Sequence, residues 1–367
     1  MGLLIVDVGS FSLPYDYFYI KEVAKYRDIE FHCSFTKYNN EYIEKIRSLS
    51  GVKVKVWNIS RSEACFFQAV YNLCLFYIFI IRFGRRYDAV HALWLPNGLI
   101  DGLLFKVFSK SFVLTCHNPF PHNVKRYASW FLRFSYSLPD KIIFVSGYSY
   151  RLFKENFART DSLFVIQHGI MPLDFEDKDH SIDLSNFLEV DKINFVFWGR
   201  VSRYKGVDFL VKLCKFFPII VAGKWDQNLS SEKKIIQSRG LMIDGYLSLN
   251  AIKSIMHDYN SVFVLPYLEA SQSGILYTLV AEGQVFIASD VGDIGDFFQF
   301  NGLSDLLFDP NDLNSFYKAA NSAVDNFEFF KAKMMALRYD YSWDHLVTSE
   351  IIDGIFDAAK VHSHGHR

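Results

Sequence analysis

The sequence has few cysteines and none of the paired spacings that disulfide frameworks or zinc sites use. Its five cysteines stand singly in apolar surroundings, and they are Cys33, Cys65, Cys74, Cys116 and Cys214. An odd number at irregular spacing excludes a disulfide framework and indicates a reducing, cytosolic compartment. No cluster of metal ligands is evident, so we expect no metal. We interpret the His-rich residues 362–367 as a disordered tail, with metal binding as the weaker alternative.

We also expect no signal peptide, because the apolar run Gly2–Val8 is too short and contains Asp7. One long run without charge does occur at residues 64–81, and three arginines follow it. Its length reaches the lower limit for a transmembrane helix, but two polar side chains interrupt it and residues 87–92 resemble the next core strand. We expect a helix packed on a sheet, with part of its aromatic face at a bilayer surface. A membrane span is the alternative.

The chain has almost no net charge, −1 at pH 7, but the charge is unevenly placed. Residues 1–170 hold 21 Lys and Arg against 13 Asp and Glu, and residues 171–367 hold 18 against 27. A basic first half indicates an anionic partner on that side, although chance asymmetry between two domains is the alternative. Nucleic acid is not the expected partner, because no recognition motif accompanies the basic residues.

Composition and periodicity predict the fold class. Half of the 367 residues are hydrophobic, which is enough for two domains with large cores. Apolar strand-like runs alternate with helical stretches, at 3–8, 29–35, 52–57, 88–92, 112–116, 141–145 and 163–167, and then at 193–198, 218–222, 240–244, 261–265 and 284–288. We therefore predict an α/β protein with two successive doubly wound, Rossmann-like parallel-sheet domains.

The same pattern predicts the domain boundaries. We expect a first domain at 1–170, an acidic linker at 171–191 and a second domain at 192–341, followed by a closing helix at 342–361. A helix is also expected to begin near Tyr17, after a loop that contains Tyr15.

Residues 193–211 form the most informative stretch of the second half. An apolar strand breaks at Gly199, the cations Arg200 and Lys205 follow, and a helical pattern begins after Gly206. In an open α/β sheet this junction lies at the carboxyl edge, where ligands bind. Loop amides, a forked Arg donor and a Lys charge favour an anion such as phosphate. A solvated basic loop is the alternative.

A second stretch, residues 266–278, has a related organisation. A strand ends at Pro266 and a turn of small residues, Ser271 to Gly274, leads into a helix. Small residues at a helix start expose backbone N–H groups that suit a diphosphate, although an ordinary N-cap on a core helix is the alternative.

Together these stretches resemble a known family. GRVSRYKG, PYLEASQSG and FIASDVG, in that order, are similar to the nucleotide-binding domain of family 4 glycosyltransferases. These enzymes have the GT-B fold, so the resemblance implies two doubly wound, Rossmann-like parallel-sheet domains facing across a cleft. YDAVHALW, LTCHNPFPHN, KIIFVSGYS and VIQHGI resemble first-domain stretches of that family. The resemblance is patchy over the first 85 residues and nearly continuous from 87 to 300.

The resemblance implies a retaining, metal-independent hexosyltransferase that uses a UDP- or GDP-sugar. Its catalytic residues would be His117, Arg200 and Lys205, with the two cations on the leaving diphosphate. The residues implied at the donor are Gly199, Arg200, Lys205, Glu269, Gln272, Ser273, Gly274 and Thr278. Those implied on the acceptor side are Tyr15, Ser146 and His122. His91 and His168 are expected to be structural.

The sequence departs from the family at one motif. Family members usually have two glutamates with seven residues between them, and this chain lacks that pair. Glu269 is followed at that spacing by Tyr277, and counting back from Gly283 places Ala270 and Thr278 at the two positions. The SQSG turn resembles a variant of this loop in which backbone and hydroxyl contacts replace the carboxylates.

The acceptor is expected to meet the first domain. Residues 124–138 combine three cations with four aromatic side chains, which suits the surface of an anionic membrane, although a core helix with a basic edge is the alternative. We expect a cytoplasmic enzyme, peripheral on the inner membrane, that extends a lipid-linked saccharide in bacterial surface polysaccharide biosynthesis. A non-catalytic GT-B subunit and a nucleotide-sugar epimerase are the alternatives.

Overall fold

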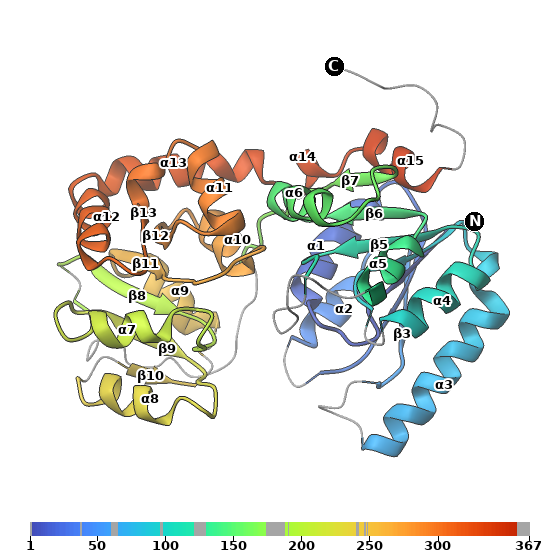
Figure 1. Cartoon of the computed structure of the whole chain (residues 1–367), viewed down its shortest axis with the longest axis horizontal. Coiled ribbons are helices and arrows are strands. Elements are labelled where there is room, and N and C mark those ends of the chain that lie inside the picture. The colour runs from blue at the N-terminus through green and yellow to red at the C-terminus, as the bar shows by residue number, and fades with distance from the viewer. Residues whose placement is uncertain are drawn as a thin grey trace. The chain divides into compact units, whose positions relative to one another are not determined.

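The chain folds into two compact units. The computed structural model describes residues 2–36, 39–59, 65–95, 98–120, 130–173, 188–189, 191–239, 242–245, 247 and 249–357. One unit combines Met1–Gly169 with Ser342–Arg367, and the other is Ile170–Tyr341 (Figure 1). Each unit contains one parallel sheet covered by helices, which confirms the predicted α/β class with two Rossmann-like domains.

The sheet of the first unit has seven parallel strands in the order β3-β2-β1-β4-β5-β6-β7. The strands are β1 (Leu3–Val6), β2 (Ile29–Cys33), β3 (Val52–Val56), β4 (Ala89–Ala92), β5 (Phe112–Cys116), β6 (Lys141–Phe144) and β7 (Leu163–Val165). The central strands are buried on both faces and consist mostly of aliphatic and aromatic residues, as parallel strands under two helix layers must.

Helices cover both faces of this sheet. They are α1 (Leu13–Val23), α2 (Glu41–Arg47), α3 (Phe66–Phe83), α4 (Leu99–Phe108), α5 (Trp130–Ser137) and α6 (Gly147–Asn156), with a 3-10 turn at Gly84–Arg86. Phe76 of α3 and Phe105 of α4 share one core cluster with Val6 and Val90 of the sheet. Right-handed crossovers place α3 to α6 on that face and α1 and α2 on the other.

The sheet of the second unit has six parallel strands in the order β10-β9-β8-β11-β12-β13. They are β8 (Asn194–Trp198), β9 (Ile220–Gly223), β10 (Met242–Asp244), β11 (Ser261–Leu265), β12 (Val285–Ser289) and β13 (Leu307–Phe308). Its helices are α7 (Val207–Leu213), α8 (Ser230–Gln237), α9 (Leu249–His257), α10 (Gly274–Ala281), α11 (Gly292–Phe300), α12 (Leu313–Asp325) and α13 (Phe327–Asp340), with a 3-10 turn at Ser304–Leu306. Phe197, Val264 and Ile287 lie at the centre of its core.

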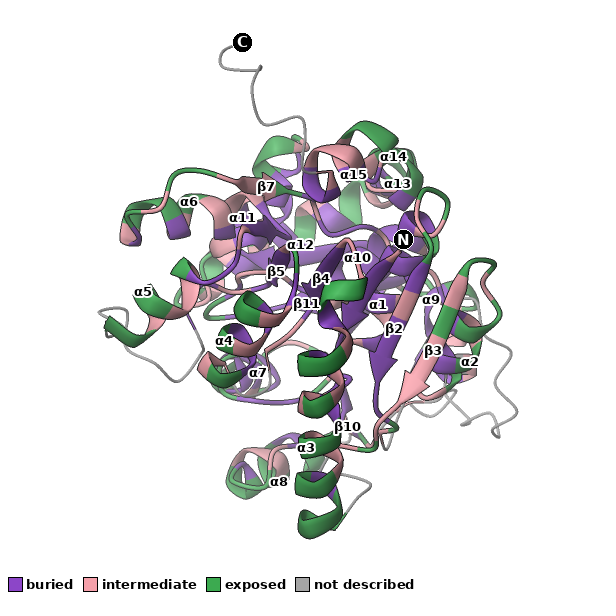
Figure 2. Ribbon diagram, turned by 90° about the vertical axis from the view of Figure 1, so that its right-hand side faces the viewer, coloured by how far each residue is buried: buried purple, intermediate pink, exposed green. Residues whose placement is uncertain are grey.

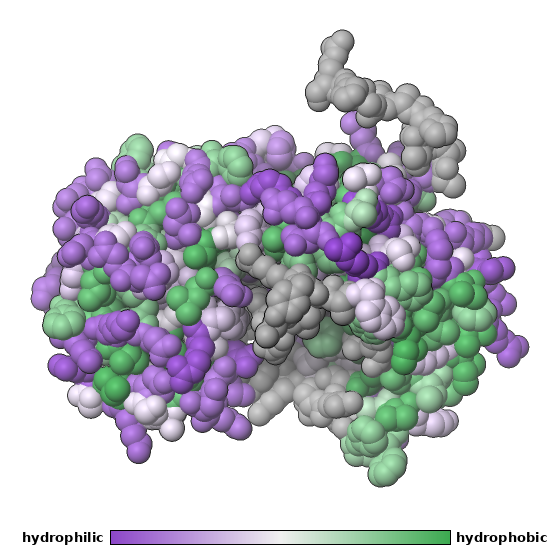
Figure 3. All heavy atoms as spheres, viewed as in Figure 1, coloured by the Kyte–Doolittle hydropathy of each residue, from purple (hydrophilic) through white to green (hydrophobic). Residues whose placement is uncertain are grey.

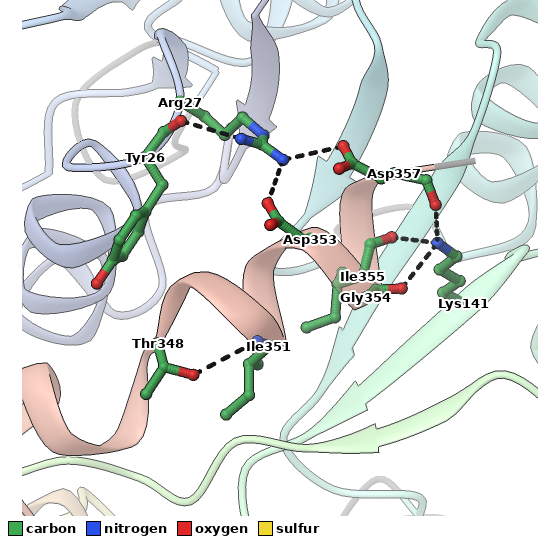
Figure 4. A network of polar contacts seen from close by, with 9 residues as sticks. All are labelled: Tyr26, Arg27, Lys141, Thr348, Ile351, Asp353, Gly354, Ile355 and Asp357. Atoms are coloured by element: carbon green, nitrogen blue, oxygen red, sulfur yellow. Dashed lines mark hydrogen bonds and ion pairs between the residues drawn. The ribbon is translucent and has the colours of Figure 1, made fainter. Parts of the chain in front are cut away.

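The C-terminal segment returns to the first unit as two short helices, α14 (Trp343–Leu346) and α15 (Ser349–Phe356). Arg27 donates to the carboxylate of Asp353 at 2.6 Å, and the Lys141 ammonium donates to the Gly354 carbonyl at 3.2 Å (Figure 4). The single closing helix predicted at 342–361 is wrong in its described part, because Val347 and Thr348 are extended and Thr348 caps a new helix.

Other boundaries also differ from the prediction. Helix α1 begins at Leu13 instead of near Tyr17, with Pro14 in its first turn, where the missing N–H costs nothing. Tyr15 therefore lies in a helix and not in a loop. Each predicted strand has its counterpart, but β13 was missed, because a two-residue strand has no periodicity to detect.

Candidate active site

The candidate site in each unit lies beside the point where the strand order of the sheet reverses. The strand order reverses between β1 and β4 in the first unit and between β8 and β11 in the second. At such a reversal the following helices leave to opposite faces and open a crevice at the carboxyl ends of the strands, where ligands bind in α/β sheets.

In the second unit, two glycines shape the loop after β8. Gly199 has a φ of +126° and Gly206 a φ of +80°. A Cβ on Gly206 would lie 1.8 Å from the carbonyl oxygen of Pro266, so only glycine fits this approach. The loop that carries the two predicted cations is therefore held against the loop after β11, and Leu268 N–H donates to the Tyr204 carbonyl at 2.8 Å.

Lys205 is a partly buried cation in this crevice. Its Nζ lies 5.0 Å from the centroid of the Tyr267 ring, and no carboxylate within the described part of the chain forms an ion pair with it. Burial alone would lower the pKa of Lys205, but the hydroxyl groups of Tyr267 and Tyr204 outweigh this effect and the pKa is raised. Lys205 thus keeps its charge for an anion.

Arg200, unlike Lys205, forms an ion pair with a carboxylate. Its Nε donates to a carboxylate oxygen of Asp226 at 2.7 Å, and its side chain is 63% exposed. The prediction did not include Asp226, which lies in the loop after β9 and orients the guanidinium group. The only available signal was a carboxylate following the apolar strand, and the sequence did not show that it would meet Arg200.

The start of α10 forms the second wall. Ser273 is the N-cap residue, but its hydroxyl makes no capping hydrogen bond. The Gln272 side-chain oxygen is buried without a partner among the described residues. The first N–H groups of α10, which begins at Gly274, have no partner within the helix, as at every helix start. The predicted pairing of a cationic loop with a small-residue helix start is present in this unit.

Two predicted donor residues are placed differently. The Thr278 hydroxyl donates to the Gly274 carbonyl of its own helix at 3.1 Å, and the side chain is buried. Glu269 is exposed. Ala270, the counterpart of the first family glutamate, is buried and its carbonyl accepts the N–H of Asp293. The helix therefore turns position 278 inward.

In the first unit, His117 follows β5 and is buried. Its ring is stacked on Trp94 at 4.2 Å with an interplanar angle of 3°, and the ring of Tyr15 meets it edge-on at 4.9 Å. Burial lowers the pKa of His117 to about 3, and the neighbouring His168 and His91 add to this effect. The imidazole is therefore neutral at physiological pH.

The same cluster contains polar atoms without partners. Among the described residues, Tyr15 Oη and Trp94 Nε1 are buried and form no hydrogen bond, and the His117 ring has a backbone contact with Leu93 but no partner of ordinary hydrogen-bond geometry. Unpartnered buried polar groups are costly, and a bound water, an ion or a ligand is a common explanation for them. Trp94 was missed because a tryptophan after a strand gives no chemical signal by itself.

The other histidines and Ser146 have internal partners. His91 Nε2 lies 2.8 Å from Thr115 Oγ1, and His168 Nδ1 lies 2.8 Å from the Gly169 carbonyl, as expected for structural histidines. The Ser146 hydroxyl accepts from the Ser149 N–H at the start of α6, which is a capping role. His122 and the first part of the predicted basic helix, 124–129, lie outside the described residues.

The sequence prediction also missed a pair of buried carboxyl groups, Asp7 and Asp16. Asp7 follows β1 and accepts the Phe11 N–H at 2.7 Å, while Asp16 lies in the first turns of α1. Burial raises the pKa of Asp7 to about 6 and, together with repulsion from Asp7, raises that of Asp16. A carboxylate at the end of an apolar strand was a visible signal, but only the fold brings the pair together.

No group of three His, Cys, Asp or Glu side chains in the described ranges has an arrangement that would hold a metal ion. Two surface pockets, of about 500 and 1020 Å³, lie between α5 and α6 and beside β13, and neither is lined by a predicted site residue.

Comparison with known proteins gives a partial sequence match. Residues 37–172 match the family model described as Glycosyltransferase Family 4. This range contains Trp94, His117 and Ser146. No curated protein matches the chain.

Solved structures match the fold over nearly the whole chain. Sucrose-phosphate synthase from Thermosynechococcus elongatus is 15% identical with a TM-score of 0.66, over 94% of this chain and 95% of that one. HepE of Anabaena in complex with UDP-glucose is 13% identical with a TM-score of 0.68, over 96% and 97%. WaaG, a glycosyltransferase involved in lipopolysaccharide biosynthesis, is 10% identical with a TM-score of 0.62, over 97% and 99%. Identities this low show the fold alone, which is GT-B.

Proposed function

We propose that this chain, whose family-model match over residues 37–172 and GT-B fold support a glycosyltransferase, moves a sugar from a UDP- or GDP-sugar to a lipid-linked or oligosaccharide acceptor. The proposal includes retention of the anomeric configuration and catalysis without a metal ion. The observation that carries it is Lys205, a cation with no carboxylate partner among the described residues, beside a helix start at a topological switch point.

The donor assignment rests on the second unit. Lys205 and Arg200 supply positive charge, and the amides at the start of α10 supply hydrogen-bond donors suited to a diphosphate. Among the structural neighbours, HepE is in complex with UDP and with UDP-glucose, which favours a uridine donor here.

The chemistry follows from the charges. The bond between the anomeric carbon and the diphosphate oxygen breaks, and the nucleoside diphosphate leaves with the bonding electrons. A bond forms from the acceptor oxygen to the same carbon on the face that the diphosphate leaves, and the acceptor proton passes to the departing diphosphate oxygen. Lys205 and Arg200 stabilise the negative charge that develops on the leaving group, which is the task a divalent ion performs in other transferases.

The first unit supplies the acceptor side in this proposal. A neutral imidazole at His117 accepts or donates one hydrogen bond at each nitrogen, and the Tyr15 hydroxyl and the Trp94 indole N–H add two further groups. Such groups match sugar hydroxyls. His117 therefore orients the sugar or acceptor, and with its pKa near 3 it is too weak a base to take a proton directly.

Two structural neighbours support the proposed pathway. WaaG is described as involved in lipopolysaccharide biosynthesis, and WaaB as a lipopolysaccharide outer core galactosyltransferase. Surface-polysaccharide assembly on the cytoplasmic face of the bacterial inner membrane is the corresponding proposal here.

A thermal-shift panel of UDP, GDP, CDP and ADP tests the donor site. A ligand that binds the folded state at 100 times its Kd adds about 2.7 kcal/mol of stability. We expect a shift with UDP or GDP that Lys205→Ala abolishes. The matched control is Lys215→Ala, an exposed lysine in the same unit.

Release of the nucleotide from the corresponding nucleotide sugar, followed without acceptor, separates a transferase from a non-catalytic subunit. No shift with any nucleotide would contradict the proposal, and binding without turnover would favour the non-catalytic alternative.

A further inference from the structure

Helix α3 is unusual among the helices of this chain. It is the one helix in the described residues that is long and apolar enough to cross a membrane, and an 18-residue window within Phe66–Arg86 has a mean hydropathy of 1.6. Core helices of soluble proteins often meet this criterion because they are buried. Only 17% of this window is buried, so burial in the protein core does not account for its composition.

One face of α3 packs on the sheet and the opposite face is exposed. Phe76 and Ile80 are fully buried against β1 and β4. The exposed large apolar side chains of the helix are Phe66, Phe67, Val70, Tyr71, Leu75, Ile78 and Ile81. Figure 2 shows α3 as mostly exposed along its length, and Figure 3 shows hydrophobic residues gathered over it.

Two neighbouring helices extend this surface. α4 packs beside α3, and a Cβ on Gly102 of α4 would contact Leu138, which follows α5 directly. Their exposed large apolar residues are Ile100, Leu103, Val107, Trp130, Phe131 and Phe134. These helices carry 13 of the 26 exposed large hydrophobic side chains of the described chain, and we call them the α3–α4–α5 surface. A patch of this kind on a folded protein marks an interaction site.

The charges at the C-terminal end of α3 are positive. No Asp or Glu occurs between residues 64 and 87, and the exposed Arg82 lies in the last turn of α3, with Arg85 and Arg86 in the 3-10 turn that follows. Arg85 donates to the Val107 carbonyl at 3.0 Å, which places it at the exposed edge of α4. The one acidic residue of α4, Asp101, is buried and accepts the Tyr77 hydroxyl at 2.7 Å.

We propose that the α3–α4–α5 surface docks on a bilayer that contains anionic lipids, with α3 lying in the plane of the interface. Apolar side chains flanked by arginines match the boundary between acyl chains and negatively charged headgroups. A transmembrane orientation would remove Phe76 and Ile80 from the core, and both ends of α3 connect to strands of the same sheet. The proposal deepens the proposed function by naming the surface that brings the enzyme to a lipid-linked acceptor.

Vesicle co-sedimentation of the full chain tests the proposal, using phosphatidylcholine vesicles with and without 30% phosphatidylglycerol. The variant is Phe67→Ser/Tyr71→Ser/Ile78→Ser, at side chains 83%, 59% and 57% exposed. The matched control is Phe216→Ser/Phe300→Ser/Phe329→Ser in the second unit, at 70%, 77% and 61%. We expect the α3 variant to bind anionic vesicles at least roughly tenfold more weakly, and the control to bind as the unchanged chain does.

A second variant tests whether binding to anionic vesicles requires the arginines. Arg82→Gln/Arg86→Gln should weaken binding to anionic vesicles by roughly fivefold per arginine and reduce its salt dependence. Binding to neutral vesicles should change little. A thermal-shift measurement with nucleotide runs in parallel, because it needs no lipid. Failure of vesicle binding with intact nucleotide binding would therefore overturn the docking proposal alone.

Contact of α3 itself with lipid is measured at Cys74, an exposed residue of α3. Cys65, the other exposed cysteine, is changed to Ser, and Cys74 then carries an environment-sensitive fluorophore. A blue shift on anionic vesicles, with quenching by shallow but not deep bilayer quenchers, supports the interfacial orientation. Deep quenching with resistance to alkaline extraction, equal loss in the two triple-serine variants, or a lipid-independent dimer that the α3 variant dissociates would each overturn it.

Discussion

The points where the strand order reverses differ between the two units in the charge of their polar groups. In the second unit, Lys205 is a charged group in a partly exposed crevice, held by a loop whose glycines permit a close approach. In the first unit, His117 is a neutral group enclosed by Trp94 and Tyr15. The difference in charge fits the proposed division of roles, in which one edge binds a charged diphosphate and the other offers neutral hydrogen-bonding groups to sugar hydroxyls.

Lys205→Ala should have the largest effect on this comparison. Removing one preorganised cation from a developing negative charge costs roughly 100-fold to 1000-fold in rate, so kcat/KM for transfer should fall by about that factor. Steady-state kinetics with the donor identified by the nucleotide panel measures it. An unchanged kcat/KM would remove the phosphate role of this edge.

His117→Ala should have a smaller and differently distributed effect. Loss of a positioning group should lower kcat by roughly 10-fold to 100-fold, while the Kd of the nucleotide changes little, because the nucleotide is assigned to the other unit. In the unchanged chain, the kcat should show no titration of His117 between pH 5 and 8, since the pKa of His117 is about 3. Equal losses in kcat and nucleotide affinity would instead indicate a structural role.

Asp16→Asn should have the smallest effect, which we expect on the pH dependence of the folding stability. Folding raises the pKa of the buried Asp7 from 3.8 to about 6 and that of Asp16 as well, so the folded state binds more protons. The contribution of Asp7 to stability is therefore present below pH 4 and is lost as the pH rises through about 6, by roughly 3 kcal/mol, and the contribution of Asp16 changes in the same direction.

The Asp16→Asn variant has one ionisable carboxyl group in the buried pair instead of two. We expect its Tm at pH 8 to exceed that of the unchanged chain, with a smaller difference at pH 4. Asp208→Asn, at a carboxyl group 54% exposed, is the control and should leave the pH dependence of the Tm unchanged. Parallel Tm curves for Asp16→Asn and the unchanged chain would contradict a protonated pair.

Much of the second-unit site was predictable because its signal is local. A strand, a glycine, two cations and a helix start within 20 residues already imply an anion site at a sheet edge, and the structure places Lys205 and Ser273 on neighbouring loops of that edge. Thr278 shows the limit of counting along a motif. Its position matched a family residue, but the helix turns its hydroxyl onto the Gly274 carbonyl.

The first-unit cluster was less predictable because its members come from distant parts of the chain. Tyr15, Trp94 and His117 follow three different strands, and only the strand order β1-β4-β5 makes them neighbours. Asp7 and Asp16 show the same limit: each is an ordinary carboxylate in the sequence, and their shared burial changes the protonation of both.

The sequence alone determined the fold class, because alternating apolar runs and helical stretches admit few arrangements other than parallel sheets with crossover helices. It also sufficed to predict an anion site in the loop after β8, because the glycines and cations of that loop are adjacent in the chain. The tertiary structure decided which apolar helix is buried. Both α3 and α10 are apolar, but α10 is enclosed in its unit while α3 crosses the outside of a sheet with one face exposed, and only the packing of neighbouring elements distinguishes the two.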